Sequence, residues 1–394
     1  MRYASITNRL AGLGGAKWAV HNKARAMKEA GANIIELTIG EPDVPTPQAL
    51  KDAAIKAINA DRTGYSNGQG EPRLLEALAE RYSKRRGRPF APDQIICLPG
   101  TQTALFAALM ALVESGDEVI IGDPMYATYM GLIAATGAKA VPVALRAERG
   151  FRIDAADIAA QVTPRTKVIF LNTPHNPTGA ILTPDDIVEI GTLAREKDLW
   201  IISDEVYEDL VFEGSNFTSP LSYPEFADRV VATSSISKSH AAPGFRSGWC
   251  VGPAEFIARL LPISETMLFG SQPFIADMTA DALSKPSPVA KGMSERHARR
   301  AELIHDRLHG ISGLAVHRPD AGMFALVDIR SSGLSGEDFA FRLLDSTGVA
   351  VMPGESFGDA LAGWVRLSLT QPDALIAEAC QRIAQHMQKL GEAA

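Results

Sequence analysis

The chain has 394 residues, of which 46% are hydrophobic and 22% are charged, a balance that favours a large folded core over disorder. The formal net charge of −7 and the lack of a basic block argue against a nucleic-acid surface. Three widely spaced cysteines and the absence of long apolar runs predict a cytoplasmic protein with no disulfide framework, no metal site and no membrane span.

The first ninety residues predict three helices and a short strand around turns rich in proline and glycine. The length of the whole chain suggests two or three packing units. In chain order we expect a helix over 8–30, a strand over 34–39, a turn over 40–47, a helix that opens at Pro47 and runs to residue 60, a polar loop over 61–70 and a helix from 72. Gly40 in the turn suggests a backbone that approaches a ligand, although an ordinary turn glycine is the alternative.

The middle of the chain alternates apolar strand patterns with helical ones. The predicted strands are 94–98, 118–122, 167–171, 200–203 and 230–232. Such alternation predicts an α/β fold with a largely parallel sheet between layers of helices.

The last third changes character, with long helices rich in arginine and glutamate. We expect helices over 276–283, 289–308 and 336–345 and at the C-terminus, and strands over 322–328, 349–352 and 364–369. This pattern predicts a smaller α+β domain. The predicted division is an N-terminal arm and helix packing with the small domain (1–45), a large domain (46–275) and a small domain (276–394).

Polar residues follow one strand after another in the predicted sheet. Ligands of such sheets lie outside the carboxyl ends of the strands, so these residues are candidates for a shared site. They are Gly100, Thr101, Gln102, Tyr126, Asn172, Asn176, Asp204, Tyr207, Ser235 and Lys238. Gly100 and Thr101 also precede a helix, where free N–H groups favour an anion, although many such turns bind nothing.

Residues 235–249 carry one lysine among small and hydroxyl residues. Burial would favour the neutral amine of Lys238, and a neutral amine can form a Schiff base with an aldehyde. Hydroxyls such as those of Ser235 and Ser237, with the guanidinium of Arg246, suit a phosphate. Pyridoxal 5'-phosphate carries both an aldehyde and a phosphate, whereas the alternative is a solvated serine-rich loop.

Asp204 ends a strand that should be buried. A buried carboxylate needs a cationic partner to stay ionised, and a pyridinium N–H could supply it. The alternative is a carboxylate that caps the next helix. Arg366 lies inside a predicted strand, where a buried guanidinium needs an anionic partner. A substrate carboxylate could be that partner, and a structural ion pair is the alternative.

The run Ser-Ile-Ser-Lys at 235–238, followed by Gly-Phe-Arg-Ser-Gly-Trp at 244–249, resembles the lysine signature of class I aminotransferases that use pyridoxal phosphate. Asp-Glu-Val-Tyr at 204–207 and Asn-Pro-Thr-Gly at 176–179 match the same family at similar spacing. The resemblance extends from Gly40 to Arg366. It implies fold type I, with residues 249–252 returning as an antiparallel strand.

The resemblance also implies a role for each candidate residue. Lys238 would be catalytic, and the substrate carboxylate would be bound by Gly40, Asn176 and Arg366. The remaining residues would bind the cofactor: Tyr126 on the ring face, Asn176 and Tyr207 at its 3'-oxygen, Asp204 at its nitrogen, with Gly100, Thr101, Gln102, Ser235, Ser237 and Arg246. Tyr65 would reach the phosphate of the partner's cofactor, which implies a homodimer with shared active sites.

The implied activity is transfer of an amino group from an amino acid to a 2-oxo acid by a ping-pong mechanism. A pyridoxal-phosphate lyase or decarboxylase is an alternative, because fold does not fix reaction. A non-catalytic sensor domain is another, disfavoured because a DNA-binding domain has no room before Gly40. Segments 1–4, 237–240, 268–271 and 322–330 resemble bacterial arginine–pyruvate aminotransferases, while aspartate and aromatic donors stay open.

Overall fold

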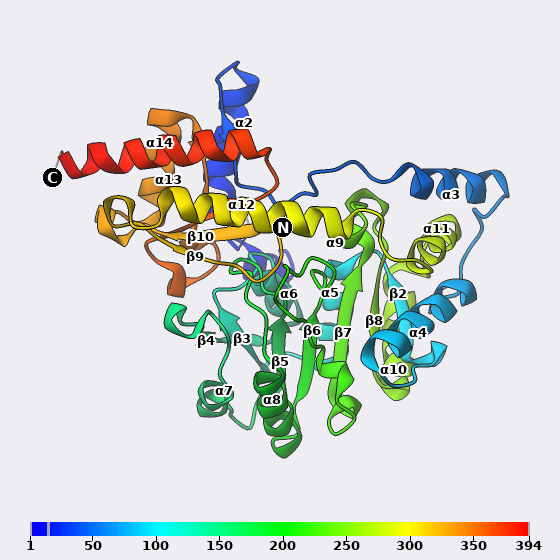
Figure 1. Cartoon of the computed structure of the whole chain (residues 1–394). Helices are drawn as coiled ribbons and strands as arrows, with labels where there is room; N and C mark the ends of the chain where they lie inside the picture. The colour runs from blue at the N-terminus through cyan, green and yellow to red at the C-terminus, as the bar shows by residue number, and fades with distance from the viewer. Residues whose placement is uncertain (1, 14–15, 393–394) are drawn as a thin grey trace.

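A seven-stranded sheet forms the centre of the larger part of the molecule in a computed structural model, which describes residues 2–13 and 16–392 (Figure 1). Its strand order is β2-β8-β7-β6-β5-β3-β4. The strands are β2 Ile95–Leu98, β3 Glu118–Asp123, β4 Lys139–Ala144, β5 Thr166–Asn172, β6 Trp200–Asp204, β7 Val230–Ser235 and β8 Gly248–Val251. Only β8 runs antiparallel to its neighbours, as the resemblance implied.

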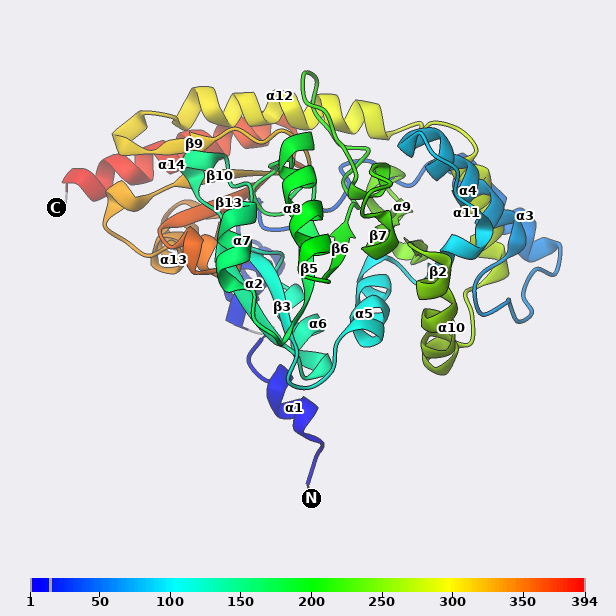
Figure 2. The ribbon, with the colours of Figure 1, turned by 90° about the horizontal axis from the view of Figure 1, so that it is seen from below.

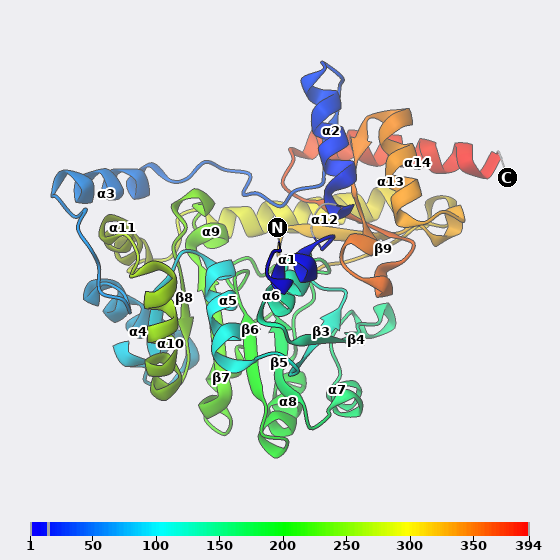
Figure 3. The same ribbon diagram turned by 180° about the vertical axis from the view of Figure 1, so that it is seen from behind.

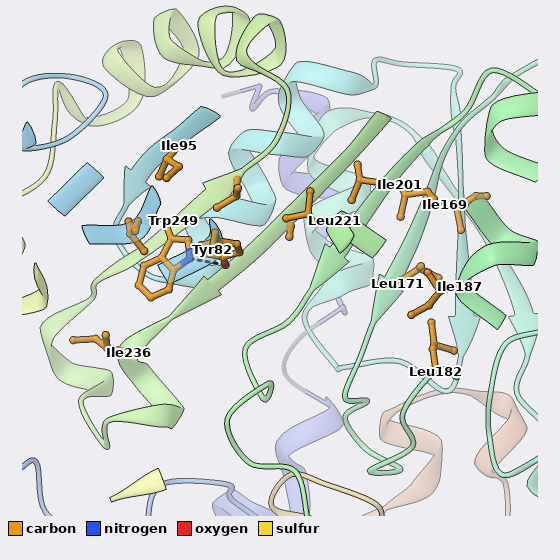
Figure 4. Packing of buried hydrophobic residues seen from close by; sticks show 14 of the residues in the cluster. Tyr82, Ile95, Ile169, Leu171, Leu182, Ile187, Ile201, Leu221, Ile236 and Trp249 are labelled. Carbon is orange, nitrogen blue, oxygen red and sulfur yellow. Dashed lines mark hydrogen bonds between the residues drawn. The ribbon is translucent and has the colours of Figure 1, made fainter. Parts of the chain in front are cut away.

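Helices cover both faces of this sheet, because its strands are buried on both sides; every residue of β2, β7 and β8 is buried. One face packs against α5 Thr101–Leu112, α6 Tyr129–Thr136 and α10 Ala254–Leu268 (Figure 3). The other face packs against α4 Pro72–Arg86, α7 Ala155–Gln161 and α8 Pro184–Glu196. On that face the buried indole of Trp249 donates a 2.9 Å hydrogen bond to the Tyr82 hydroxyl (Figure 4).

The smaller part is built on a four-stranded antiparallel sheet of order β12-β13-β10-β9. Its strands are β9 Ala315–His317, β10 Phe324–Asp328, β12 Met352–Pro353 and β13 Trp364–Ser368, and α13 Gly336–Thr347 and α14 Asp373–Glu392 pack around it. The long helix α12 Ala290–Leu308 reaches from this unit over the larger one (Figure 2). Its Met293 packs near Tyr207, whereas Ile304 and Leu308 lie in the core of the smaller unit.

The N-terminal segment contacts both units. Helix α1 Ser5–Leu10 lies against α6, whereas α2 Ala19–Glu29 lies against α13, and β1 Ile35–Glu36 pairs in parallel with β11 Val349–Ala350. Helices α3 Gln48–Asn59 and α11 Pro273–Leu283 pack on each other at the edge of the larger unit. The predicted boundary after residue 275 falls inside α11, so we propose that the large domain extends to the end of this helix.

Several predicted elements needed correction. The single helix over 8–30 is two helices, because the chain turns at Gly12 with a positive φ of 81°. The strand over 34–39 is shorter, because the next carbonyls bond elsewhere: that of Leu37 accepts from Ser368 and that of Thr38 from Arg366. The strand over 349–352 is split between β11 and β12.

The elements that the sequence did not predict include β4, β9 and α10. β4 is a partly exposed edge strand that contains Pro142, β9 has only three residues, and α10 contains Pro262. Each lacks the uniform apolar or helical pattern on which the sequence argument relied. No helix in the described ranges is long and apolar enough to cross a bilayer.

Candidate active site

One cavity lies at the carboxyl ends of the sheet strands, between the large and small units. It is lined by all the predicted site residues except Gly100, Asn172 and Tyr65. The lining side chains that the sequence argument missed are Trp18, Ile39, Glu41, Leu105, Tyr129, Val206, Pro243 and Phe324. The strand-end rule therefore brought together polar residues of the large unit, but it missed the apolar and aromatic lining of that unit and the residues that other segments contribute.

Lys238 lies in the short helix α9 Ile236–Ser239, which the Ser235 side chain caps by accepting a hydrogen bond from the Ser237 N–H. The lysine Nζ donates to the Gly40 carbonyl oxygen at 2.7 Å. Burial lowers the pKa of this amine to about 8, and the nearby charge of Glu41 opposes the shift. An amine with this pKa can be deprotonated near neutral pH and so act as a nucleophile or a base.

Gly40 is a close-approach glycine rather than an ordinary turn glycine. A Cβ at this position would collide with the ring of Phe324 from β10. The absence of a side chain therefore lets the small unit close over the turn and keeps the Gly40 carbonyl within reach of Lys238.

One end of the cavity is suited to bind an anion, because it combines the guanidinium of Arg246 with the N-terminus of helix α5. Gly100 has a φ of +83°, and a Cβ there would collide with this guanidinium, so Gly100 shapes the site without lining it. Thr101 begins α5, and its buried hydroxyl has no hydrogen-bond partner within the described ranges. An unsatisfied hydroxyl, open helix N–H groups and a cation together fit a phosphate. Gln102 lies beside them and accepts from the Thr128 hydroxyl at 3.1 Å.

Asp204 occupies the base of the cavity at the end of β6. Its carboxylate accepts from the Tyr129 hydroxyl at 2.7 Å and from the Val206 N–H at 3.1 Å. Burial raises the pKa of this carboxyl to about 6, and these two donors oppose the shift. No lysine or arginine in the described parts of the chain pairs with it, so a cationic ligand group would stabilise its charge.

Asn176 contacts two other polar side chains of the cavity, those of Tyr207 and Arg366. Its amide nitrogen lies 3.5 Å from the Tyr207 hydroxyl, and its amide oxygen accepts from Arg366 at 3.0 Å. Burial raises the pKa of Tyr207 far above its usual value, so its hydroxyl keeps its proton and can act as a donor.

Arg366 lies in the middle of β13 and is 2% exposed. It donates to Asn176 and, at 2.7 Å, to the Thr38 carbonyl, while its Nε has no partner in the described structure. The guanidinium lies 3.8 Å from the Phe324 ring centre and 4.3 Å from that of Phe357. Burial lowers its pKa to about 9. No carboxylate of the described chain pairs with it, and the geometry leaves it able to receive one from a ligand.

One sequence candidate, Tyr65, lies away from the cavity. Tyr65 is 91% exposed in the loop between α3 and α4, where its ring meets the ring of Phe269. His175, the residue before Asn176, does not line the cavity: its ring bonds the Thr178 hydroxyl at 2.8 Å, and burial lowers its pKa to about 4, which favours the neutral imidazole.

The comparisons with known proteins agree with this site. The family model described as aminotransferase class I and II matches residues 32–383. An arginine–pyruvate transaminase of Pseudomonas aeruginosa is 45% identical over 98% of both chains, and an aspartate/prephenate aminotransferase of Cereibacter sphaeroides is 36% identical over 93% of this chain and 94% of that one.

Solved structures show the same fold. The aspartate aminotransferase of Thermus thermophilus with maleate has a TM-score of 0.90 at 32% identity, covering 98% of this chain and 100% of that one. The aspartate aminotransferase of Rhizobium meliloti has a TM-score of 0.93 at 30% identity, covering 98% and 99%. The predicted fold type I is thereby confirmed, and the named activities of the relatives favour transamination over the lyase and sensor alternatives. The chain belongs to the class I and II aminotransferase family, and it is a transaminase.

Proposed function

We propose that the chain uses pyridoxal 5'-phosphate to transfer an amino group from an L-amino acid to a 2-oxo acid in a ping-pong reaction. The observation that carries this proposal is the convergence of three groups on one cavity: the Lys238 amine, the Asp204 carboxylate and the Arg366 guanidinium. They offer an amine for an aldehyde, an anion for a pyridinium nitrogen and a cation for a carboxylate.

The residues around the cavity fit each part of this cofactor. Its phosphate would be held by Gly100, Thr101, Gln102, Ser235, Ser237 and Arg246. Asp204 would bind the ring nitrogen, Asn176 and Tyr207 the 3'-oxygen, and Tyr126 the ring face. The bound cofactor supplies an electron-withdrawing ring that stabilises negative charge at the substrate Cα.

The side chains of the chain itself provide the remaining steps. Arg366, with Asn176 and the backbone at Gly40, would bind and orient the substrate carboxylate. The Lys238 amine would remove the Cα proton and return it elsewhere on the conjugated system, first as base and then as acid. Its lowered pKa supports this role.

The test is the variant Lys238→Ala, with Lys84→Ala on the exposed end of α4 as control. We expect the first variant to fold normally by circular dichroism and to lose transamination, and the control to keep it. Turnover by Lys238→Ala near the wild-type rate would refute the assignment. Release of 2-oxo acid by the wild-type enzyme without any amino acceptor would instead favour the lyase reaction.

We further propose L-arginine as donor and pyruvate as acceptor. The identity of 45% to the Pseudomonas arginine–pyruvate transaminase supports this pair. Glu41 lines the cavity and forms no ion pair within the described residues, so its carboxylate could meet a cationic side chain. A panel of amino acids, each added while the cofactor absorbance is followed, should show the fastest bleaching with L-arginine. Faster bleaching with L-aspartate or an aromatic amino acid would overturn the choice.

The proposed assembly is a cytoplasmic homodimer with shared active sites. Tyr65 and Phe269 are both exposed apolar side chains on one surface, and three buried free cysteines suit a reducing compartment. If Tyr65 reaches the cofactor phosphate of the partner, Tyr65→Phe should weaken cofactor binding by about 1–2 kcal/mol. Sedimentation at low concentration tests the dimer, and a fully active monomer would contradict it.

A further inference from the structure

Tyr129 is the one side-chain donor to the Asp204 carboxylate in the described structure. It begins α6, and its hydroxyl donates to the Oδ2 atom of Asp204 at 2.7 Å. Both side chains are buried, Tyr129 at 3% exposure and Asp204 at 4%, and both line the active-site cavity. A hydrogen bond to a buried charged group is stronger than one at the surface, so this contact bears on the charge of Asp204.

The Tyr129 hydroxyl is held in place by its ring. The ring packs 4.6 Å from Phe170 of β5 and meets Tyr126 edge to face at 5.5 Å. Burial and the charge of Asp204 raise the pKa of the phenol well above its usual value, so the hydroxyl keeps its proton and remains a donor. The direction of the hydrogen bond is therefore fixed, from Tyr129 to the carboxylate.

Burial favours the protonated form of the Asp204 carboxyl. Few neighbouring groups stabilise the ionised carboxylate against this effect. The charge of Asp204 acts on three tyrosines, Tyr126, Tyr129 and Tyr207. Of these, only Tyr129 donates a hydrogen bond to the carboxylate. The cations Lys238, Arg246 and Arg366 line the same cavity without pairing with it. The remaining contact, from the Val206 N–H to Oδ1, would persist in any side-chain variant.

We propose that Tyr129 is a positioning residue that keeps Asp204 ionised and turned into the cavity, ready to pair with the protonated ring nitrogen of the cofactor. This inference rests on the proposed function of the site. The Asp204 carboxylate would then have two partners, the Tyr129 hydroxyl from the protein and the ring N–H of the cofactor. Ordinary core packing by Tyr129 is the competing explanation, and it requires the ring but not the hydroxyl.

The test is Tyr129→Phe, which keeps the ring and its contacts with Phe170 and removes only the hydroxyl. Tyr82→Phe is the matched control, because Tyr82 is also buried and hydrogen-bonded but lies outside the cavity. In cofactor-free protein, infrared spectroscopy follows protonation of the Asp204 carboxyl, identified as the band that Asp204→Asn removes. We expect Tyr129→Phe to raise the midpoint of this titration by about one pH unit, the size of one hydrogen bond to a charged group, and Tyr82→Phe to leave it unchanged.

An unchanged midpoint in Tyr129→Phe would overturn the proposal. This readout needs no cofactor, so it remains valid even if the proposed function fails. In the loaded enzyme, the acid limb of the profile of kcat/KM against pH should move in the same direction, with activity recovered at higher pH. A variant with lower thermal stability but an unshifted profile would show a purely structural role.

A double-mutant cycle supplies an independent check. Tyr129→Phe should weaken cofactor binding about tenfold in the wild-type background. In the Asp204→Asn background, the same change should alter the dissociation constant by no more than about twofold, because the group on which Tyr129 acts is gone. Equal losses in the two backgrounds would overturn the proposal.

Discussion

Replacing Arg366 with lysine separates the charge of the side chain from its fork of N–H donors. In the structure the guanidinium already donates to Asn176 and to the Thr38 carbonyl, and its Nε is left without a partner. Lysine keeps a positive charge at this position, but it cannot present two parallel N–H groups to a carboxylate.

The expected loss follows from the hydrogen bonds. Losing one hydrogen bond between a charged donor and a carboxylate costs about 1.5–3 kcal/mol, and 1.4 kcal/mol is a factor of about ten in rate. We therefore expect kcat/KM of Arg366→Lys to fall by about ten- to a hundredfold. The donor and the acceptor carry the same carboxylate, so both half-reactions should slow by the same factor.

Stopped-flow measurements of the two half-reactions test this expectation, one started with the amino acid and one with the 2-oxo acid. The control is Arg299→Lys, whose side chain lies on the surface of α12 and pairs with Asp373. Cofactor affinity should be unchanged in both variants. Unequal losses in the two half-reactions, or no loss in either, would refute the assignment of Arg366 to the shared carboxylate.

Four further predictions concern other parts of the site and the core. Asp204→Asn should retain the cofactor but remove the Cα proton much more slowly, because an amide does not keep the ring nitrogen protonated; unchanged turnover would leave Asp204 with only its contact to Val206. In the folded protein the pKa of Lys238 is about 8, below its usual 10.5. Between pH 8 and 10.5 the lysine is therefore protonated in the unfolded chain but largely deprotonated in the folded one. Stability of the cofactor-free protein should therefore rise as pH increases from about 8 to about 10.5, and thermal melts of Lys238→Met should lack that contribution. Tyr82→Phe leaves the buried Trp249 indole without an acceptor and should cost about 1–3 kcal/mol in denaturant titrations, while an unchanged midpoint would mean that a water replaces the hydroxyl. Gly40→Ala should raise KM for both substrates by displacing Phe324, and unaltered kinetics would show that the ring can move without cost.

The sequence predicted best what depends on local pattern. Apolar runs located the central strands, and the rule that ligands lie at the carboxyl ends of parallel strands gathered Asp204, Tyr207 and Lys238 at one place. The roles of these residues came from the resemblance, because a lysine among serines or an aspartate after a strand has several ordinary explanations. An edge strand such as β4 shows no uniform apolar run, so it was missed.

The site residues that the sequence did not predict were missed for other reasons. Trp18 and Phe324 reach the cavity from the N-terminal segment and from the smaller unit, and no local pattern specifies how these segments dock. Tyr129 follows Tyr126 by three residues at the start of a helix, a position where a buried aromatic side chain is most often part of the core. Only the distance between its hydroxyl and Asp204 identifies it as part of the site.

The contact between Gly40 and Phe324 restricts how this enzyme could be redesigned. The ring of Phe324 fills the space of the missing side chain and also lies against the Arg366 guanidinium. A larger residue at either position would displace Arg366, which is proposed to bind the carboxylate that every substrate carries. Variation aimed at new donors should therefore spare this pair and begin at Trp18 and Glu41, which line the cavity without contributing to that contact.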